Sequence, residues 1–204
     1  MNELRYDLDE YSKGSSKEYT GDVSHSHSMG LSLKIIQEVL ENYFESNKDI
    51  KILEIGGGHG SVMQVLKEEG YDTSSVTNNE NEYHNLTGRK LNPILCDMHN
   101  LNKIESKFDL ILISHVFEHS FAPYVLMTEF NEVLKNNAIV VIIVPNQDHK
   151  WVYESYHYIV PTKDQLKNLG IKTGFKCLEC DEREYLGMNH LIYVGQKERY
   201  WKDE

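Results

Sequence analysis

The stretch Lys51-Ile52-Leu53-Glu54-Ile55-Gly56-Gly57-Gly58-His59-Gly60-Ser61 decides the fold of this chain. Its apolar first half is typical of a strand that is buried on both faces of a parallel sheet. The glycines that follow allow a sharp turn, because they have no Cβ. Val62, Val65 and Leu66 then recur at helical spacing, and Gly70 is a signal for the end of a helix. A strand, a glycine turn and a helix in this order open the nucleotide-binding half of a doubly wound α/β sheet.

The spacing of the glycines restricts which nucleotide this turn can bind. The dinucleotide fingerprint G-x-G-x-x-G fails, because its last position falls on Ser61 or on Met63. No Lys-Ser or Lys-Thr pair follows the glycines, which excludes a P-loop. A glycine-rich turn without a ligand is the alternative. The pattern that remains is an acid followed by glycines at alternate positions: Glu54, Gly56, Gly58 and Gly60.

This pattern resembles the first motif of class I S-adenosylmethionine-dependent methyltransferases. The resemblance implies that Glu54 and the glycines, including Gly57, bind the cofactor. It extends over residues 30–196, because further blocks match the family in order and spacing. These blocks are Asp97-Met98, Phe108-Asp109-Leu110-Ile111, Ser114-His115-Val116-Phe117-Glu118-His119, Phe130-Asn131-Glu132-Val133-Leu134-Lys135 and Pro145-Asn146.

The matching blocks imply further contacts with S-adenosylmethionine. In the family, an acid at the position of Asp97 meets the adenine amino group. The backbone amide of the next residue, here Met98, meets a ring nitrogen of the adenine. The block after the fourth strand implies that Ser114 and His115 also lie at the cofactor.

A last element indicates the kind of acceptor. Tyr156-His157-Tyr158, ahead of Pro161-Thr162, resembles an element of the small-molecule methyltransferases of the ubiquinone-biosynthesis type. The resemblance therefore implies that a methyl group passes from S-adenosylmethionine to a small molecule, leaving S-adenosylhomocysteine. We expect a small polar molecule, such as a hydroxylated metabolite or a sugar, with an oxygen as the atom that is methylated.

The whole chain alternates between expected strands and helices, without an internal repeat. This alternation predicts an α/β fold with a single Rossmann-like, doubly wound sheet, mostly parallel with an antiparallel last strand and with helices on both faces. After the first strand, further strands are expected at 71–77, 93–98, 108–114, 138–144, 175–181 and 189–196. Helices are expected at 31–45, at 125–134, where Asn136-Asn137 ends the helix, and at 162–170, which a capping box opens.

The organisation of the chain follows from its polar ends. Residues 1–29 form a polar arm, which is either a solvated tail or a flap that folds over a site. This arm includes His25 and His27. Residues 30–197 form the expected methyltransferase domain, and residues 198–204 form a charged tail.

Composition limits the partners of this chain. It has 204 residues, with 21 Lys and Arg against 32 Asp and Glu, so the net charge is 21 − 32 = −11. Such a charge repels phosphate backbones and disfavours a nucleic-acid substrate.

No apolar run approaches a membrane span, and the N-terminal residues do not resemble a signal peptide. Three cysteines suit a reducing cytoplasm. The oligomeric state stays open, with a homodimer as one arrangement.

The C-x-x-C pair of Cys177 and Cys180 is a weak signal for redox or zinc chemistry. Cys96 is the only other thiol, so a four-thiolate zinc site is excluded. The pair lies in an expected strand, where positions three apart face opposite sides. We therefore interpret both thiols as packing residues.

His115-x-x-Glu118-His119 matches H-x-x-E-H, the inverted zinc-protease pattern. That pattern needs both histidines on one helix, four residues apart, so that they face a metal. Here His115 follows an apolar run that we expect to be a strand. The methyltransferase block accounts for the same residues, so we expect no metal site.

One residue of the family pattern is missing. Family members carry an Asp or Glu at the end of the second strand, where its two oxygens accept from the ribose hydroxyls. Here Thr77, Asn78 and Asn79 stand at that point, with Glu80 one step later. An amide has one acceptor oxygen and no charge, so Asn78 or Asn79 would bind the ribose more weakly. The departure also keeps open a different class of function, a non-catalytic cofactor-binding module that acts through a partner protein.

The acceptor is expected over the carboxyl ends of the parallel strands. His119 is the candidate general base, because an imidazole titrates near neutral pH, and His149 and His157 are alternates. Aromatic walls are expected from the loop between Pro145 and Pro161. The alternative is that its rings cover the sheet edge and that the histidines are solvated. The wall residues are Trp151, Tyr153 and Tyr156.

The glycine spacing leads to a prediction about ligand choice. We expect the protein to bind S-adenosylmethionine or S-adenosylhomocysteine, and not NAD or ATP, at Gly56–Gly60 and Asp97. Isothermal titration calorimetry with each ligand measures this preference. NAD binding at comparable strength would contradict the assignment.

Overall fold

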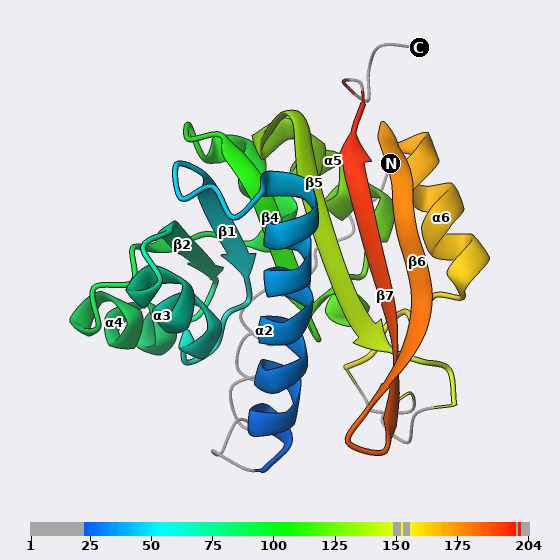
Figure 1. Cartoon of the computed structure of the whole chain (residues 1–204), viewed down its shortest axis with the longest axis horizontal. Coiled ribbons are helices and arrows are strands. Elements are labelled where there is room, and N and C mark those ends of the chain that lie inside the picture. The colour runs from blue at the N-terminus through cyan, green and yellow to red at the C-terminus, as the bar shows by residue number, and fades with distance from the viewer. Residues whose placement is uncertain (1–22, 149–151, 153–155, 199, 201–204) are drawn as a thin grey trace, which may run out of the picture.

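The computed structural model describes residues 23–148, 152, 156–198 and 200 (Figure 1). In this part of the chain, seven strands form one sheet in the order β3-β2-β1-β4-β5-β7-β6. Strands β1 to β5 are parallel, and β7 is antiparallel to both of its neighbours. The strands are β1 (Lys51–Ile55), β2 (Asp72–Thr77), β3 (Pro93–Leu95), β4 (Phe108–Ser114), β5 (Leu134–Pro145), β6 (Phe175–Tyr185) and β7 (Met188–Lys197). The expected mostly parallel sheet with an antiparallel last strand is therefore confirmed.

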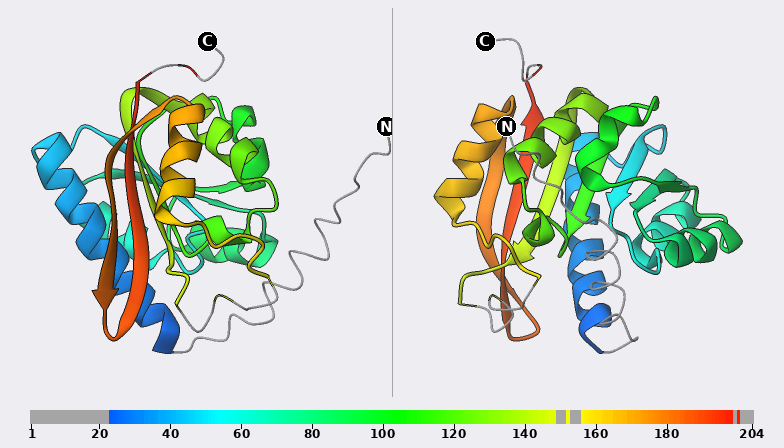
Figure 2. Two further views of the ribbon diagram at one scale, coloured as in Figure 1. Left: turned by 90° about the vertical axis from the view of Figure 1, so that its right-hand side faces the viewer. Right: turned by 180° about the vertical axis from the view of Figure 1, so that it is seen from behind.

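Helices cover both faces of the sheet, which explains why its central strands are apolar throughout. Leu110 and Leu112 of β4 pack in one cluster with residues of α2 (Val23–Phe44) and α3 (Ser61–Glu68). Ile111 and Ile113 point to the opposite face, where they pack in a second cluster. That cluster includes residues of α5 (Pro123–Val133) and α6 (Lys163–Lys172). In Figure 2, α2 lies on one side of the sheet, and α5 and α6 lie on the other.

Short elements follow the parallel strands at their carboxyl ends. The glycine turn follows β1, and α4 (Glu80–Gly88) follows β2. The 3₁₀ helix η1 (Met98–Lys103) follows β3, and a second 3₁₀ helix, η2 (Phe117–His119), follows β4. Because carboxyl ends of parallel strands meet at one edge of a sheet, these four connections lie together, at the edge where open α/β sheets bind ligands.

Two helix positions differ from the prediction. Helix α2 begins at Val23, eight residues before the apolar stripe that starts at Leu31, so residues 23–29 of the expected arm belong to this helix. Its first turns are polar, and for this reason hydrophobic periodicity did not reveal them. Helix α4 was not predicted, although Asn79 and Glu82 have the spacing of an N-cap and a third helical residue.

Strand β5 also begins earlier than the expected Ala138. Leu134 already pairs with Phe108, and Asn136 and Asn137 lie within the strand instead of forming a separate turn. The offset between partners rises from 134 − 108 = 26 to 139 − 110 = 29, so β5 carries three extra residues in a bulge. Asn137 has a positive φ of 62°, which asparagine tolerates better than most residues.

The two cysteines of the C-x-x-C pair share one face of β6, contrary to the expectation of opposite faces. The pairing with β7 shifts between Cys177 and Glu179, and this irregularity changes the alternation of side chains. Cys180 is buried in the cluster beneath α5 and α6, and Cys177 packs against the same cluster. Burial raises the pKa of Cys180 to about 11, so this thiol stays protonated. The interpretation as packing residues agrees with this placement.

No helix in the described part of the chain combines the length and the apolar character that a bilayer crossing needs.

Candidate functional site

The glycine turn after β1 is packed tightly against the protein on one side and open on the other. Gly56 has a φ of +69°, and a Cβ added there would lie 2.6 Å from a methyl carbon of Val116. The amide of Gly56 donates to the carbonyl of Val76, which joins the turn to the end of β2. At Gly58, with a φ of +50°, a Cβ would meet no described atom within 4 Å. The turn therefore offers its backbone to a ligand at Gly58.

Glu54 places a carboxyl group beneath this turn. The residue is only 6 % exposed, and its Oε2 has no hydrogen-bond partner among the described residues. A Cβ at Gly57 would lie 2.2 Å from that oxygen and 2.5 Å from Oγ of Ser75, so only glycine fits there. Burial raises the pKa of Glu54 to about 8. A cationic ligand group at the turn would give this carboxyl the partner that the protein does not supply.

Asp97 is an ionised acid at the end of β3. Its Oδ1 accepts from the backbone amide of His99 at 2.8 Å and lies 3.0 Å from Nδ1 of the same residue. Burial raises the pKa of Asp97, but these bonds from His99 outweigh burial, so its pKa lies below the usual range. Nε2 of His99 is 2.9 Å from Oγ of Ser120, and the Phe121 ring packs on the imidazole. These contacts of His99 with Ser120 and Phe121 fix Asp97 in place, beside the buried Met98.

The end of β2 carries a carboxylate that the sequence analysis did not identify. Thr77 donates a hydrogen bond of 2.7 Å to Oε2 of Glu82, from the first turn of α4. Asn79 caps that helix, and its side-chain oxygen accepts from the amides of Asn81 and Glu82. The exposed Asn78 extends its side chain to Asp97. The acceptor oxygen of Asn79 is therefore already in use, whereas Glu82 brings a charged group to the strand end.

The residues after β4 form a histidine-rich group, whose members are His115, Glu118 and His119. Ser114 accepts a hydrogen bond from Ser32 of α2, and His115 has a φ of +52°. Nδ1 of His115 lies 3.5 Å from Oε1 of Glu118, and its ring centroid lies 5.0 Å from that of His190 on β7. The H-x-x-E-H pattern would require His115 and His119 to lie on one helix. They do not, because η2 begins only at Phe117.

The segment 156–159 is fastened onto this group. Nδ1 of His119 lies 2.9 Å from the carbonyl oxygen of Tyr156, and the amides of Tyr158 and Ile159 donate to the carbonyl of Glu118. The ring centroids of His119 and His157 are 5.0 Å apart. Glu118, His119 and His157 each offer one ligand atom within 4.8 Å of the others. The structure therefore brings His157 to His119 across 38 residues of sequence.

Glu118 is the most deeply buried member of this group. It is 1 % exposed, and its Oε2 has no hydrogen-bond partner within the described segments. Burial acts to raise the pKa of Glu118. The hydrogen bond and charge of His115 and the charge of His119 lower this pKa and outweigh burial, so it lies below the usual range. A buried carboxylate thus faces two imidazoles. His149, Trp151 and Tyr153, which the sequence analysis also named, lie outside the described residues.

Comparison with known proteins connects this site with a family. Residues 29–179 match the family model of a methyltransferase domain. No curated protein matches the chain. One similar solved structure is the Burkholderia thailandensis 1,6-didemethyltoxoflavin-N1-methyltransferase with bound 1,6-didemethyltoxoflavin and S-adenosylhomocysteine. It is 19% identical with a TM-score of 0.74, and the match covers 93% of this chain and 87% of that one.

Two other solved structures share the fold at lower TM-scores. One is a SAM-dependent methyltransferase from Archaeoglobus fulgidus, 20% identical with a TM-score of 0.64, covering 81% of this chain and 94% of that one. The other is magnesium protoporphyrin IX methyltransferase from Synechocystis PCC 6803 with bound SAM, 10% identical with a TM-score of 0.63. That match covers 82% of this chain and 80% of the other.

The buried Glu54 leads to a prediction about stability and pH. Its pKa of about 8 lies above the ordinary value of 4.5, so the folded protein binds this proton more tightly than the unfolded chain. The free energy of unfolding should therefore fall as pH rises from about 5 to about 8, by up to about 1.4 kcal/mol per pH unit. Glu54→Gln cannot titrate and should lose this component. Urea unfolding of both proteins at each pH measures the difference, and equal pH dependence would contradict the prediction.

Proposed function

This chain belongs to the methyltransferase domain family and is a class I S-adenosylmethionine-dependent methyltransferase, and we propose that it methylates an oxygen of a small polar molecule. The observation that carries the proposal is the position of the histidine-rich group. This group follows β4, and β4 pairs with β1, whose carboxyl end leads into the glycine turn. A cofactor on the turn would present its methyl group toward this polar end of the site.

The residues at the turn fit S-adenosylmethionine, which carries an ammonium and a sulfonium group. In this proposal the orphaned carboxyl of Glu54 faces positive charge at the turn, and the open backbone at Gly58 allows close approach. The ionised Asp97 would accept from the adenine amino group. The other proposed cofactor contacts are Gly56, Gly57, Gly60, Met98, Ser114 and His115.

We infer that Glu82 takes the place of the missing ribose acid. Its carboxylate is held at the end of β2 by Thr77, where the family pattern places an acid. A carboxylate forms stronger, charge-assisted hydrogen bonds with hydroxyl groups than an amide does. Asn78 could add one bond through its side chain, whereas the oxygen of Asn79 is engaged in capping α4.

The acceptor side of the site suits a hydroxyl group. A backbone carbonyl can only accept, so Nδ1 of His119 must donate to Tyr156, and its Nε2 then carries the lone pair. The acceptor oxygen would bond to the methyl carbon while the carbon–sulfur bond breaks and its electron pair stays on sulfur. The hydroxyl proton would pass to Nε2 of His119. The sulfonium is already activated, so alignment supplies much of the catalysis.

The net charge of −11 supports a small acceptor over a nucleic acid, because the chain repels phosphate backbones. Tyr156 and His157 belong to the segment fastened onto Glu118 and His119, and they would border the acceptor. His149 as an alternate base, and Trp151 and Tyr153 as walls, remain proposals from the sequence.

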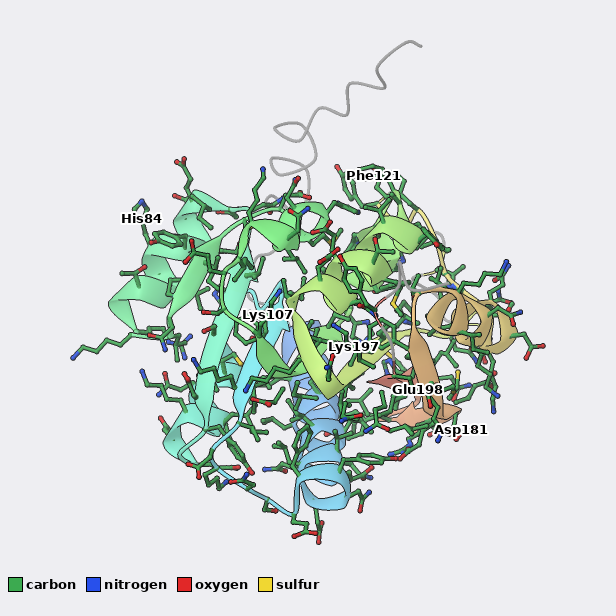
Figure 3. All side chains as sticks on the ribbon, turned by 90° about the horizontal axis from the view of Figure 1, so that it is seen from above. His84, Lys107, Phe121, Asp181, Lys197 and Glu198 are labelled. Carbon is green, nitrogen blue, oxygen red and sulfur yellow. The ribbon has the colours of Figure 1, made fainter. Side chains whose placement is uncertain are left out.

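The proton-accepting role of His119 gives the test of this function. We expect His119→Ala to lower kcat by about 10²-fold or more, because general-base catalysis is lost, while the affinity for S-adenosylhomocysteine stays nearly unchanged. His84→Ala is the matched control, because His84 lies on α4, well apart from Phe121, which follows His119 by two residues (Figure 3).

Assays over a panel of hydroxylated small molecules and amines would measure kcat, and calorimetry would measure cofactor binding. Normal turnover by His119→Ala would contradict the base role. Turnover only with nitrogen acceptors would contradict the oxygen acceptor. Tight cofactor binding without turnover on any acceptor would favour the alternative of a non-catalytic binding module.

A further inference from the structure

Glu118, His119 and His157 form a cluster with the chemistry of a metal site. One donor atom of each residue lies within 4.8 Å of the other two. Two of these residues are adjacent on η2, and the third comes from the segment 156–159, which three hydrogen bonds hold in place. The donors therefore converge from two separate parts of the chain, and these hydrogen bonds join the two parts to each other.

The buried carboxylate of Glu118 is an independent indication of a cation. Its Oε2 is shielded from solvent and accepts no hydrogen bond from any residue that the structure describes. A buried charge without a partner is costly, and within the described segments His115 approaches this carboxylate on the side of Oε1. One oxygen of the same carboxylate lies within 4.8 Å of a ring nitrogen of His119 and of His157. An ion bound there would satisfy it.

The hydrogen bonds around the cluster resemble those that orient the ligands of metal sites. Histidines that bind a metal commonly donate their other N–H to a backbone carbonyl, which fixes the tautomer and the ring orientation. His119 makes this bond with the carbonyl oxygen of Tyr156, at 2.9 Å from Nδ1. A carboxylate ligand is in turn held by a polar neighbour, and His115 lies 3.5 Å from Oε1 of Glu118.

We propose that Glu118, His119 and His157 bind one divalent transition-metal ion. Zn²⁺ is the ion with which this proposal is tested below. Two imidazoles and one carboxylate are a ligand set of zinc sites that keep a position open for water or substrate. Nitrogen ligands disfavour Mg²⁺ and Ca²⁺, which prefer oxygen. Donors bound at about 2.0–2.1 Å in a tetrahedral site lie about 3.4 Å apart. The three donor atoms lie within 4.8 Å of one another, so no pair has to approach by more than about 1.4 Å when the ion binds.

This ligand set differs from the one that the H-x-x-E-H pattern implies. In that pattern, His115 and His119 would bind the metal from one helix, and His157 would have no part. In the structure His115 precedes η2 and contacts Glu118, whereas His157 completes the cluster. The sequence pattern therefore contains two of the ligands and one supporting residue.

The role of the ion rests on the proposed function, but its binding does not. A bound ion would take the lone pair of His119 that otherwise accepts the proton of the acceptor. The open position of the ion could then hold the acceptor oxygen and lower the pKa of its hydroxyl group, so that its proton would pass to water. In that case His119 acts as a ligand of the ion.

Metal binding is tested on the full chain without an affinity tag, stripped of metal and titrated with Zn²⁺ and, separately, with Mg²⁺. We expect one Zn²⁺ per chain and no comparable Mg²⁺ binding. Glu118→Gln and His157→Ala should each weaken Zn²⁺ binding by about 10²-fold or more, and His115→Ala by about tenfold. Circular dichroism would show that each variant is folded.

Two control variants separate this site from adventitious binding. His84→Ala removes an exposed histidine on α4, and Cys177→Ser disrupts the C-x-x-C pair, so both should retain full Zn²⁺ binding. Loss in Cys177→Ser, no binding in the unmodified chain, or a larger loss in His115→Ala than in His157→Ala would overturn the proposal. If Zn²⁺ does not bind and His119→Ala still lowers kcat, the proposed function stands without the metal. If Zn²⁺ binds and no acceptor is methylated, the metal site stands without the function.

Discussion

The parallel pairing of β1 with β4 determines where the functional groups of this protein lie. Ile55 pairs with Ile113, so the glycine turn and the segment after Ser114 leave the sheet next to one another. The contact is close, because a Cβ at Gly56 would overlap Val116. Both strands pack in a buried cluster on each face, and a shift by one residue would exchange the side chains between these two closely packed clusters, so packing fixes this register. The cofactor turn and the histidine-rich group are therefore neighbours as a consequence of the core.

Two buried carboxyl groups at this edge, those of Glu54 and Glu118, each have one oxygen without a hydrogen-bond partner among the described residues, and their pKa values are shifted in opposite directions. Glu54 has no nearby charge to lower its pKa, so burial alone raises it to about 8. Glu118 is flanked by His115 and His119, which hold its pKa below the usual range. Buried groups of this kind cost stability and are often found at functional sites. We interpret both as places where a cationic ligand group or an ion completes the structure.

The fold could be predicted from the sequence because its determinants are local. The apolar run of β4 and the spacing of Gly56, Gly58 and Gly60 are each contained in a few residues. The contact of Thr77 with Glu82 and the proximity of His157 to His119 depend on how α4 and the segment 156–159 fold back, which periodicity does not encode.

The sequence-based predictions that the structure contradicts also concern features without a periodic pattern. The early start of β5 and the shared face of Cys177 and Cys180 both arise from bulges, and an irregularity in pairing leaves no periodic signal. The expected cofactor contacts at Asp97 and Met98, in contrast, came from a resemblance, and they remain predictions about a bound state.

A crystal structure with S-adenosylhomocysteine bound would show whether one edge of the sheet brings the cofactor next to the acceptor. We predict that the ribose lies beside Glu82, with the sulfur directed toward Glu118, His119 and His157. A ligand whose sulfur faces away from these three residues, or is separated from them by packed side chains, would contradict this prediction.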